Sequence, residues 1–423
     1  MTPAESARTE PVTAAHAAAL DAADPLARFR KRFVGAEDDL SYLDGNSLGR
    51  PLRITAGRMA DFVERSWGGR LIRGWDEGWF EAPLELGDRI AAATLGAAPG
   101  QTVVGDSTSV LLYKLLRAAV DHQAARDPRR REIVVDRDNF PTDRYLVEGI
   151  AAERDLQVRW VQAPPDAGVS VDVLGEAVGE QTAVVLLSHV AYQSGHLVDV
   201  GAVTALAHEH GALVVLDLCH SVGAVPVELD GWGVDLAVGC TYKYLNGGPG
   251  APAFCYVADR HQAELTQPVQ GWMGHADPFA MVPGYRPAEG MRRFLTGTPP
   301  IVAMQPIGDM LELIEEASIE AVRAKSVALT SYAIDLADEL LAPAGVTVGT
   351  PRDPALRGSH VLLRHPRMRE VVAALWARDV IPDFRNPDGL RVGLSPLSTS
   401  FTELHRGLRA VADLLPPRPA VGL

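Results

Sequence analysis

The chain has 423 residues, enough for two or three folded cores at roughly 100–200 residues each. Its 40 basic and 54 acidic residues give a formal net charge of −14, which argues against a general nucleic-acid binder or an anionic-membrane binder. Hydrophobic residues make up 47% of the chain, a fraction typical of globular proteins and too high for a disordered one. Cys219, Cys240 and Cys255 form no CxxC pair, which predicts a reducing compartment without disulfides or a structural zinc.

No segment has the pattern of a targeting peptide or a membrane span. Residues 14–20 are rich in alanine, but they include His16 and have acidic residues on both sides. No apolar window approaches the roughly 18 residues that a membrane helix needs. We therefore expect a cytoplasmic protein without a membrane partner, whose N-terminus is loosely held up to about residue 23.

The middle of the chain alternates between short apolar runs and segments of helical length. Strands are expected at 132–135, 157–161, 183–187, 213–216, 236–238 and 253–257, and helices at 142–154, 171–178 and 200–210. This alternation predicts βαβ units in an α/β fold, with a mainly parallel sheet and helices on both faces. Ligands of such sheets bind beyond the carboxyl ends of the strands, so polar residues that follow a strand are the first candidates for a site.

The pattern changes after about residue 300. A long helical stretch at 308–341 is followed by expected strands at 347–348, 360–363 and 390–394 and by helices at 369–378 and 402–415. This mixture predicts a smaller α+β domain, and the pair Pro299-Pro300 marks the junction. We expect an N-terminal segment, 1–58, that packs on the small domain, a large domain at 59–300 and the small domain at 301–423.

An acid and a lysine follow two of the expected strands. Asp217 ends one strand, and Lys243 follows the next strand along the chain, between two tyrosines and before a Gly-rich turn. A pyridoxal-phosphate site needs an amine that bonds to the cofactor aldehyde and a carboxylate that pairs with the pyridine nitrogen. The alternative is a helix-capping Asp217 and a solvated Lys243. The chain has only four lysines, and the other three (Lys31, Lys114 and Lys325) fit solvated faces, which favours Lys243 as the reactive amine.

Several motifs occur in a fixed order along the chain. They are LDGNSLG at 43–49, NFPTD at 139–143, DLCH at 217–220, GCTYKYLNGGPG at 239–250, GWMGH at 271–275, GTPPI at 297–301 and SFT at 400–402. Together they resemble the kynureninase family, and its bacterial branch in particular, from about residue 20 to residue 415. The motif around Lys243 is long and specific, and the others agree with the family in order and spacing.

The resemblance implies a fold and an activity. The fold is that of pyridoxal-phosphate (PLP) dependent transferases of fold type I, with a large domain built on a mainly parallel seven-stranded sheet flanked by helices and a smaller α+β domain. The activity is the hydrolytic Cβ–Cγ cleavage of L-kynurenine, and of 3-hydroxykynurenine, to anthranilate or 3-hydroxyanthranilate and L-alanine in tryptophan catabolism. The implied cofactor is PLP, without a metal, and the implied assembly is a homodimer with shared active sites.

The resemblance also implies roles for single residues. Lys243 and Tyr242 would be catalytic. The cofactor would contact Thr108, Ser109, Phe140, Pro141, Thr142, Asp143, Ser188, Asp217, His220, Tyr242, Lys243, Trp272 and Thr298, some of them from a second subunit. The substrate would contact Arg391 through its α-carboxylate and Trp75 through its aromatic ring, with Ser47 and His275 nearby. A proton relay through Tyr242 would need a locally lowered pKa or a phosphate relay, because an unperturbed phenol titrates near 10.

The residues themselves leave further interpretations open. Thr108 and Ser109 fit an ordinary helix cap equally well, and Trp75 fits a core residue. Met273 and Ser398 stand where the family usually has Phe and Tyr, so a roomier pocket for ring-substituted kynurenines is also consistent with the sequence. A desulfurase-like or aminotransferase-like PLP enzyme of the same fold type remains open as well, and so does a non-catalytic binding protein that kept the fold.

Overall fold

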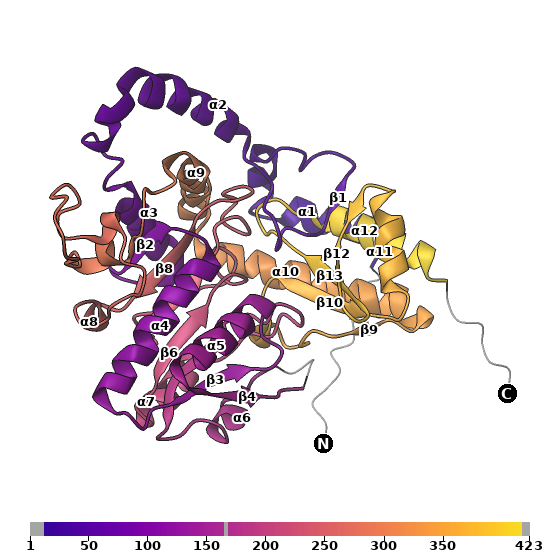
Figure 1. Cartoon of the computed structure of the whole chain (residues 1–423). Helices are drawn as coiled ribbons and strands as arrows, with labels where there is room; N and C mark the ends of the chain where they lie inside the picture. Colours follow the sequence, from indigo (N-terminus) through magenta and orange to yellow (C-terminus); the bar gives the residue numbers. More distant parts are fainter. Residues whose placement is uncertain (1–11, 165–167, 417–423) are drawn as a thin grey trace.

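The computed structural model describes residues 12–164 and 168–416, and its largest element is a sheet of seven strands (Figure 1). Their order across the sheet is β2-β8-β7-β6-β5-β3-β4. The strands are β2 (Thr102–Gly105), β3 (Glu132–Asp136), β4 (Gln157–Val161), β5 (Thr182–Ser188), β6 (Leu213–Asp217), β7 (Leu236–Gly239) and β8 (Ala253–Val257). Pairing is parallel from β4 through β7, and β8 is antiparallel to both β7 and β2. The predicted mainly parallel sheet is thereby confirmed.

Helices cover both faces of this sheet, because successive strand residues point to opposite faces and are apolar on both. On one face, strand residues such as Val135 and Val215 pack with apolar residues of α4 and α5, and on the other Val134 and Val214 pack with those of α6, α7 and α9. The helices of this part are α2 (Arg53–Asp61), α3 (Ala82–Ile90), α4 (Thr108–Arg126), α5 (Pro141–Arg154), α6 (Val171–Gly175), α7 (Val200–Glu209), α8 (Asp259–Gln262) and α9 (Ile301–Ala317).

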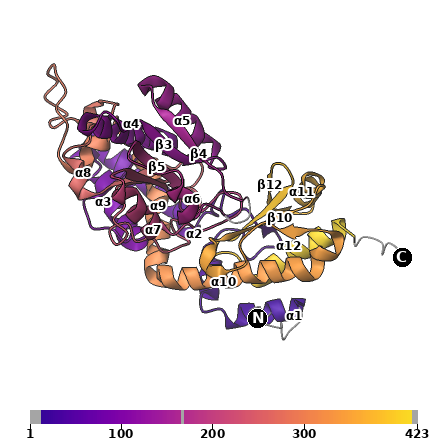
Figure 2. The same cartoon turned by 90° about the horizontal axis from the view of Figure 1, so that it is seen from below.

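A second, four-stranded antiparallel sheet lies beside the first body (Figure 2). Its order is β12-β13-β10-β9, and helices α10, α11 and α12 pack with it. The elements are α10 (Ile319–Leu336), β9 (Thr347–Val348), β10 (His360–Arg364), α11 (Met368–Trp376), β12 (Asp383–Arg385), β13 (Gly389–Gly393) and α12 (Phe401–Leu414).

The start of the described chain packs on this smaller body. Helix α1 (Ala14–Ala23) lies against α12, and strand β1 (Ser41–Tyr42) pairs in parallel with β11 (Val380–Ile381). Ala17 and Leu43 are buried in the same hydrophobic cluster as α10 and α12. Within the described residues, no helix is long and apolar enough to cross a membrane.

Two local expectations were wrong. The helical stretch expected at 308–341 begins earlier, at Ile301, and is broken at Ser318, whose backbone has a φ of 66°. Ser318 ends α9, and its hydroxyl then caps α10 by accepting from the Ala321 N–H at 3.2 Å. The short strands β2 and β12 were not expected, because runs of four and three residues are too short to show an alternating pattern.

Candidate active site

Lys243 lies in the loop that follows β7 and is only 9% exposed. Its Nζ is 3.0 Å from Nε2 of His220. Burial and the charge of Lys243 hold the pKa of His220 well below its usual range, so this imidazole is neutral and can accept a hydrogen bond. The Lys243 amine therefore has a neutral neighbour rather than a carboxylate counterion at hydrogen-bond distance.

The expectation that Lys114 and Lys325 lie on solvated faces was wrong. Both are buried, and both are paired with carboxylates: Lys114 Nζ is 2.7 Å from Asp106, and Lys325 pairs with Asp24. A lysine nitrogen that is bound to a carboxylate inside the protein is not free to bond to a cofactor aldehyde. Lys243 thus differs from the other two buried lysines because its neighbour is the neutral His220 and not a carboxylate.

Two buried carboxyl groups meet at the end of β6 and the start of α5. Asp217 ends β6, and its Oδ1 accepts from the Cys219 N–H at 2.7 Å. Asp143 lies beside it in the first turn of α5, where burial and the charge of Asp217 raise the pKa of Asp143 well above its usual value. These two effects favour the protonated form of Asp143, which could donate a hydrogen bond to Asp217.

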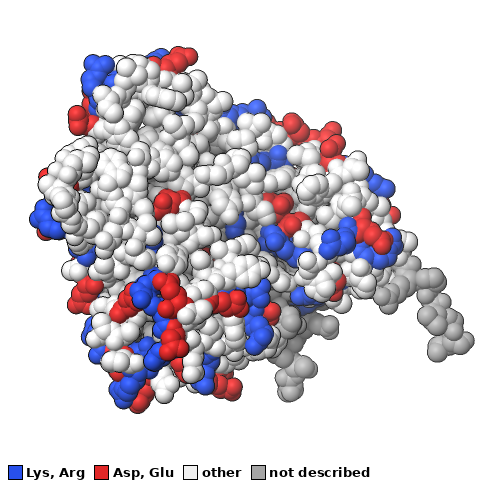
Figure 3. Space-filling model, in the orientation of Figure 1, with Lys and Arg blue, Asp and Glu red and all other residues white. Residues whose placement is uncertain are grey.

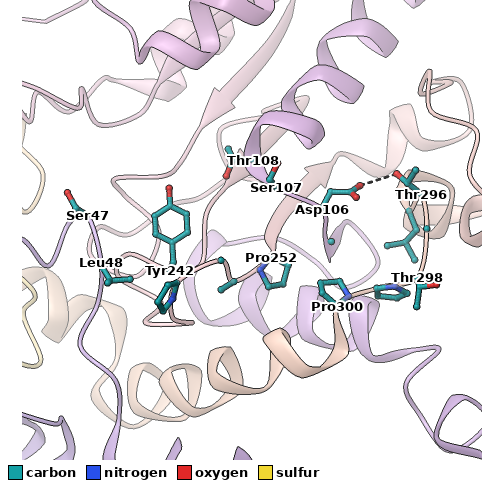
Figure 4. A pocket seen from close by; sticks show the side chains of 17 residues that line it. Ser47, Leu48, Asp106, Ser107, Thr108, Tyr242, Pro252, Thr296, Thr298 and Pro300 are labelled. Carbon is teal, nitrogen blue, oxygen red and sulfur yellow. Dashed lines mark hydrogen bonds between the residues drawn. The ribbon is translucent and has the colours of Figure 1, made fainter. Parts of the chain in front are cut away.

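A cavity of about 730 Å³ lies beside the Lys243 loop (Figure 4). Of the expected site residues, Ser47, Thr108, Tyr242 and Thr298 line it. The Tyr242 hydroxyl points toward the side where Thr108 begins α4. Backbone N–H groups at the start of a helix, together with hydroxyl groups, suit a phosphate. Ser109 is exposed and does not line the cavity.

Two points about these hydroxyl residues differ from expectation. The cap of α4 is Ser107, whose Oγ accepts from the Val110 N–H at 3.4 Å, so the ordinary capping role falls to neither Thr108 nor Ser109. The pKa of Tyr242 is raised by burial and by the neighbouring thiols, and is not lowered. Tyr242 is therefore a neutral phenol that can donate a proton but does not act as a base.

Residues of the small sheet complete the site from the opposite side. Arg391, on β13, is buried and donates to the backbone oxygen of Tyr192 and to Oγ of Ser47, both at 2.7 Å. His360, on β10, packs edge-on against His220 with ring centroids 5.4 Å apart. Sequence reasoning missed His360, because a single histidine in a strand pattern is indistinguishable from a core residue.

The start of α5 supplies the remaining expected residues of the large body. Phe140 precedes α5, and its ring stands edge-on to Tyr192 at 5.4 Å between centroids. Pro141 and Thr142 form the first turn, next to Asp143. Ser188, at the end of β5, donates to Oδ1 of Asn139 at 2.7 Å, which holds this turn against the sheet.

Lys243, Asp217 and Arg391 do not line this cavity, and neither do Trp75, Trp272 and His275, whose surroundings lie elsewhere. Trp75 packs edge-on against Trp79, with centroids 5.8 Å apart. Trp272 is 40% exposed beside Phe279, and Nδ1 of His275 lies 2.7 Å from the backbone oxygen of Asp277. The substituted positions Met273 and Ser398 also lie elsewhere, buried in side-chain packing.

The residues present fit PLP. Lys243 supplies an amine, and Asp143 and Asp217 supply carboxyl groups. The start of α4 lines the neighbouring cavity and supplies backbone N–H groups that suit an anion. Among the described residues, three buried polar atoms lack a hydrogen-bond partner here: Nδ1 of His220, Nδ2 of Asn139 and Oδ2 of Asp143. Buried polar atoms normally have partners, so a polar ligand is the occupant that these groups fit.

Fold and site together define a PLP-dependent enzyme of fold type I. A cysteine desulfurase from Thermococcus onnurineus NA1 has the same fold, with a TM-score of 0.80 over 92% of this chain and 98% of its own at 17% identity. A variant of C-DES with glycine covalently linked to its PLP cofactor matches with a TM-score of 0.80 over 91% of this chain and 99% of its own at 18% identity.

The chain belongs to the kynureninase family. It matches the kynureninase C-terminal domain family over residues 322–411 and the aminotransferase class-V family over residues 115–359. The kynureninase of Burkholderia pseudomallei (strain 1106a) is 44% identical over 406 residues, which cover 95% of each chain. The kynureninase of Pseudomonas fluorescens is 44% identical over 401 residues, which cover 94% of each chain. The predicted family and cofactor are confirmed.

The two carboxyl groups allow a matched prediction. We expect Asp143→Asn to change the PLP dissociation constant by less than about threefold, because a neutral amide can replace a neutral carboxylic acid as a donor to Asp217. Asp217→Asn removes the charge that would face the pyridine nitrogen, and we expect it to weaken PLP binding by about tenfold or more. Titration of each apoprotein with PLP, followed by visible absorbance, measures both values. Equal losses in the two variants would contradict this assignment.

Proposed function

We propose that the protein hydrolyses the Cβ–Cγ bond of L-kynurenine to anthranilate and L-alanine, and that of 3-hydroxykynurenine to 3-hydroxyanthranilate and L-alanine, in tryptophan catabolism. One observation carries the proposal. In a chain 44% identical to kynureninases, His220 lies 3.0 Å from Lys243 and packs against His360 of the small sheet, whose strand β10 pairs with the strand that carries Arg391. An amine for the cofactor and a fork for an amino-acid carboxylate are the two groups that such a substrate needs.

Each residue of the large body has one task in this proposal. When bound, PLP supplies an electron sink in its protonated pyridine ring. Lys243 holds the cofactor aldehyde through its amine and later moves the proton of the substrate Cα. Asp217 pairs with the pyridine nitrogen, and Asp143 holds its own proton toward Asp217. His220 stays neutral beside Lys243, so it leaves the amine without a competing counterion.

The remaining residues bind the two ends of the ligands. Thr108 and the start of α4 face the cofactor phosphate, and Phe140 stacks on its ring. Arg391 binds the substrate α-carboxylate, with Ser47 beside it at 2.7 Å. Tyr242 would hold its phenolic proton toward the carbon that is left when the aryl acid departs. Water is the second substrate, so the products together contain one water more than L-kynurenine.

The buried thiols argue against a desulfurase activity. A desulfurase needs a cysteine that can reach the substrate sulfur, whereas Cys219, Cys240 and Cys255 are all buried and unpaired. Met273 and Ser398 are buried as well and line no part of the cavity, so unsubstituted kynurenine remains the leading substrate over ring-substituted forms.

Incubation of the purified, PLP-loaded protein with L-kynurenine tests the proposal. We expect anthranilate and L-alanine to appear in equal amounts. Release of a keto acid with conversion of the cofactor to its amine form would favour an aminotransferase. A protein that binds PLP but leaves L-kynurenine, 3-hydroxykynurenine and methylated kynurenines unchanged would contradict the proposed activity.

We propose a homodimer with shared active sites. A broad, largely uncharged area covers the α2 side of the molecule and the loop near residue 280 (Figure 3). Exposed apolar residues belong to these segments, among them Ile72 at 77% and Met281 at 79% exposure. Trp75, Trp272 and His275 do not reach the cavity of their own subunit, which supports contacts to the cavity of a partner.

We expect Ile72→Asp to convert the dimer to a monomer, because a buried charge at an apolar interface costs several kcal/mol. Sedimentation equilibrium measures the mass, and activity should fall with the dimer fraction. Leu356→Asp is the control, since Leu356 is also exposed, at 46%, but lies on the small body. A monomeric wild-type protein with full activity would contradict shared sites.

We propose that the chain divides into an N-terminal segment up to about residue 58, a large PLP-binding domain to residue 300 and a small domain from 301 to 423. The separate hydrophobic clusters of the two sheets support a large and a small body. Residues of α9 such as Ile307 and Ile314 lie in a cluster of the large sheet, which supports a junction after α9 instead of at residue 300. The pairing of β1 with β11 supports packing of the N-terminal segment on the small domain.

A further inference from the structure

The guanidinium of Arg391 is already partly occupied. An arginine has five N–H donors. Nη1 donates to the Tyr192 backbone oxygen and Nη2 to Ser47, both at 2.7 Å. With its amide turned to satisfy both neighbours, Asn46 accepts from Nε at 3.0 Å and donates to Asp44 at 3.2 Å. One N–H therefore remains on each terminal nitrogen, the pair that a substrate carboxylate would use.

Asp383 stands where that carboxylate must bind. Strands β12 and β13 pair so that Asp383 lies directly opposite Arg391, and its Oδ2 is 2.7 Å from Nη2. However, Oδ2 has no aligned hydrogen bond with any described residue. The contact is thus an ion pair without the directed bond that makes arginine–carboxylate pairs strong. A carboxylate whose two oxygens each accept a hydrogen bond from the Arg391 guanidinium would bind more tightly than Asp383 does.

Arg385 gives Asp383 a second counterion. The same oxygen, Oδ2, is 2.6 Å from Nε of Arg385. Residues two apart on a strand share a face, so Oδ2 of Asp383 lies between the two guanidinium groups and contacts both. Asp383 can therefore release Arg391 and still remain paired.

A second acid makes this release favourable. Oδ1 of Asp44 is 3.9 Å from Nη2 of Arg391, and burial and the charge of Asp383 raise the pKa of Asp44 to about 6. The carboxyl groups of Asp44 and Asp383 thus both lie beside the Arg391 guanidinium. The substrate carboxylate would be a third negative group there, and it would be repelled unless one of the two moved away. Asp383 is the one that has another cation to pair with.

We propose that Asp383 is a positioning residue that holds Arg391 in the empty enzyme and is exchanged for the substrate carboxylate, while Arg385 receives it. The inference rests on the proposed function only for the identity of the carboxylate as that of an α-amino acid. The exchange makes and breaks no covalent bond and moves no proton. Part of the binding free energy is spent on separating Asp383 from Arg391, so the pair keeps the affinity for carboxylates below what Arg391 alone would give.

Propanoate tests the exchange on the PLP-loaded enzyme, because it carries the carboxylate of alanine without the amine. Its dissociation constant can be measured by calorimetry without turnover. We expect Asp383→Asn to bind propanoate about tenfold more tightly and to have a lower KM for L-kynurenine. Arg385→Gln should bind propanoate about tenfold more weakly and have a higher KM. Asp388→Asn is the matched control, since Asp388 forms a 2.9 Å pair with Arg364 in the same domain and should leave both values unchanged.

The double variant separates exchange from a general effect of charge. If Arg385 acts by receiving Asp383, Arg385→Gln should have little effect once Asp383 is Asn. Full additivity overturns the proposal, and so does unchanged or weaker propanoate binding in Asp383→Asn. If Asp383→Asn does not fold, unchanged propanoate binding in Arg385→Gln overturns it instead. A wild-type enzyme that leaves L-kynurenine intact contradicts the proposed function but leaves the propanoate test in place.

Discussion

Lys243→Ala is expected to lower kcat for L-kynurenine by more than about 10³-fold and to abolish the visible band of covalently held cofactor. The amine is the group that bonds to the cofactor aldehyde, and no other described lysine can replace it. Lys114 and Lys325 are tied to carboxylates, with Lys114 Nζ 2.7 Å from Asp106. Single-turnover kinetics and the absorbance spectrum of the variant measure the two effects.

Lys31→Ala is the control for this experiment, because Lys31 is exposed and does not line the cavity. Its activity and spectrum should equal those of the wild type. Turnover by Lys243→Ala at more than a tenth of the wild-type rate would refute the assignment of this amine, whatever the fold.

Arg391→Lys should reduce kcat/KM by about 10²–10³-fold, mainly through a higher KM. Lysine keeps the positive charge but loses the planar fork, and each charge-assisted hydrogen bond contributes about 1.5–3 kcal/mol. The site is buried, so water cannot replace the missing donors. Steady-state kinetics with L-kynurenine measure the loss.

Arg364→Lys is the matched control for Arg391→Lys. Arg364 lies on β10 of the same sheet and pairs with Asp388 at 2.9 Å, outside the cavity lined by Ser47 and Tyr242. This control should keep kcat/KM within about twofold, as is usual for a partly exposed pair. If Arg391→Lys kept the same kcat/KM as the Arg364→Lys control, the substrate carboxylate would have to bind elsewhere.

The sequence predicted the central strands of the large sheet and the residues that follow them. The apolar runs of β5 and β6 are buried on both faces, and such runs are readable without knowledge of their neighbours. Asp217 and Lys243 were found because both follow such strands, and parallel strands bring their carboxyl ends to one edge. The long motif around Lys243 then identified the family.

The other half of the site depends on contacts that no local pattern shows. Asp383 meets Arg391 only because β12 pairs with β13 in one register, and β12 has just three residues. His360 meets His220 across the two bodies. Lys114 was expected to be solvated because one of its two partners is distant in sequence. This partner, the Phe294 backbone oxygen at 2.6 Å, lies 180 residues further along the chain.

The contact between Ser47 and Arg391 joins residues 344 positions apart. Closing so long a loop is slow and entropically costly, so contacts of this kind form late in folding. During synthesis, the part of the chain that carries Lys243 leaves the ribosome well before β13 does. The residues expected to bind the cofactor, from Thr108 to Thr298, are therefore synthesised before the arginine expected to bind the substrate carboxylate.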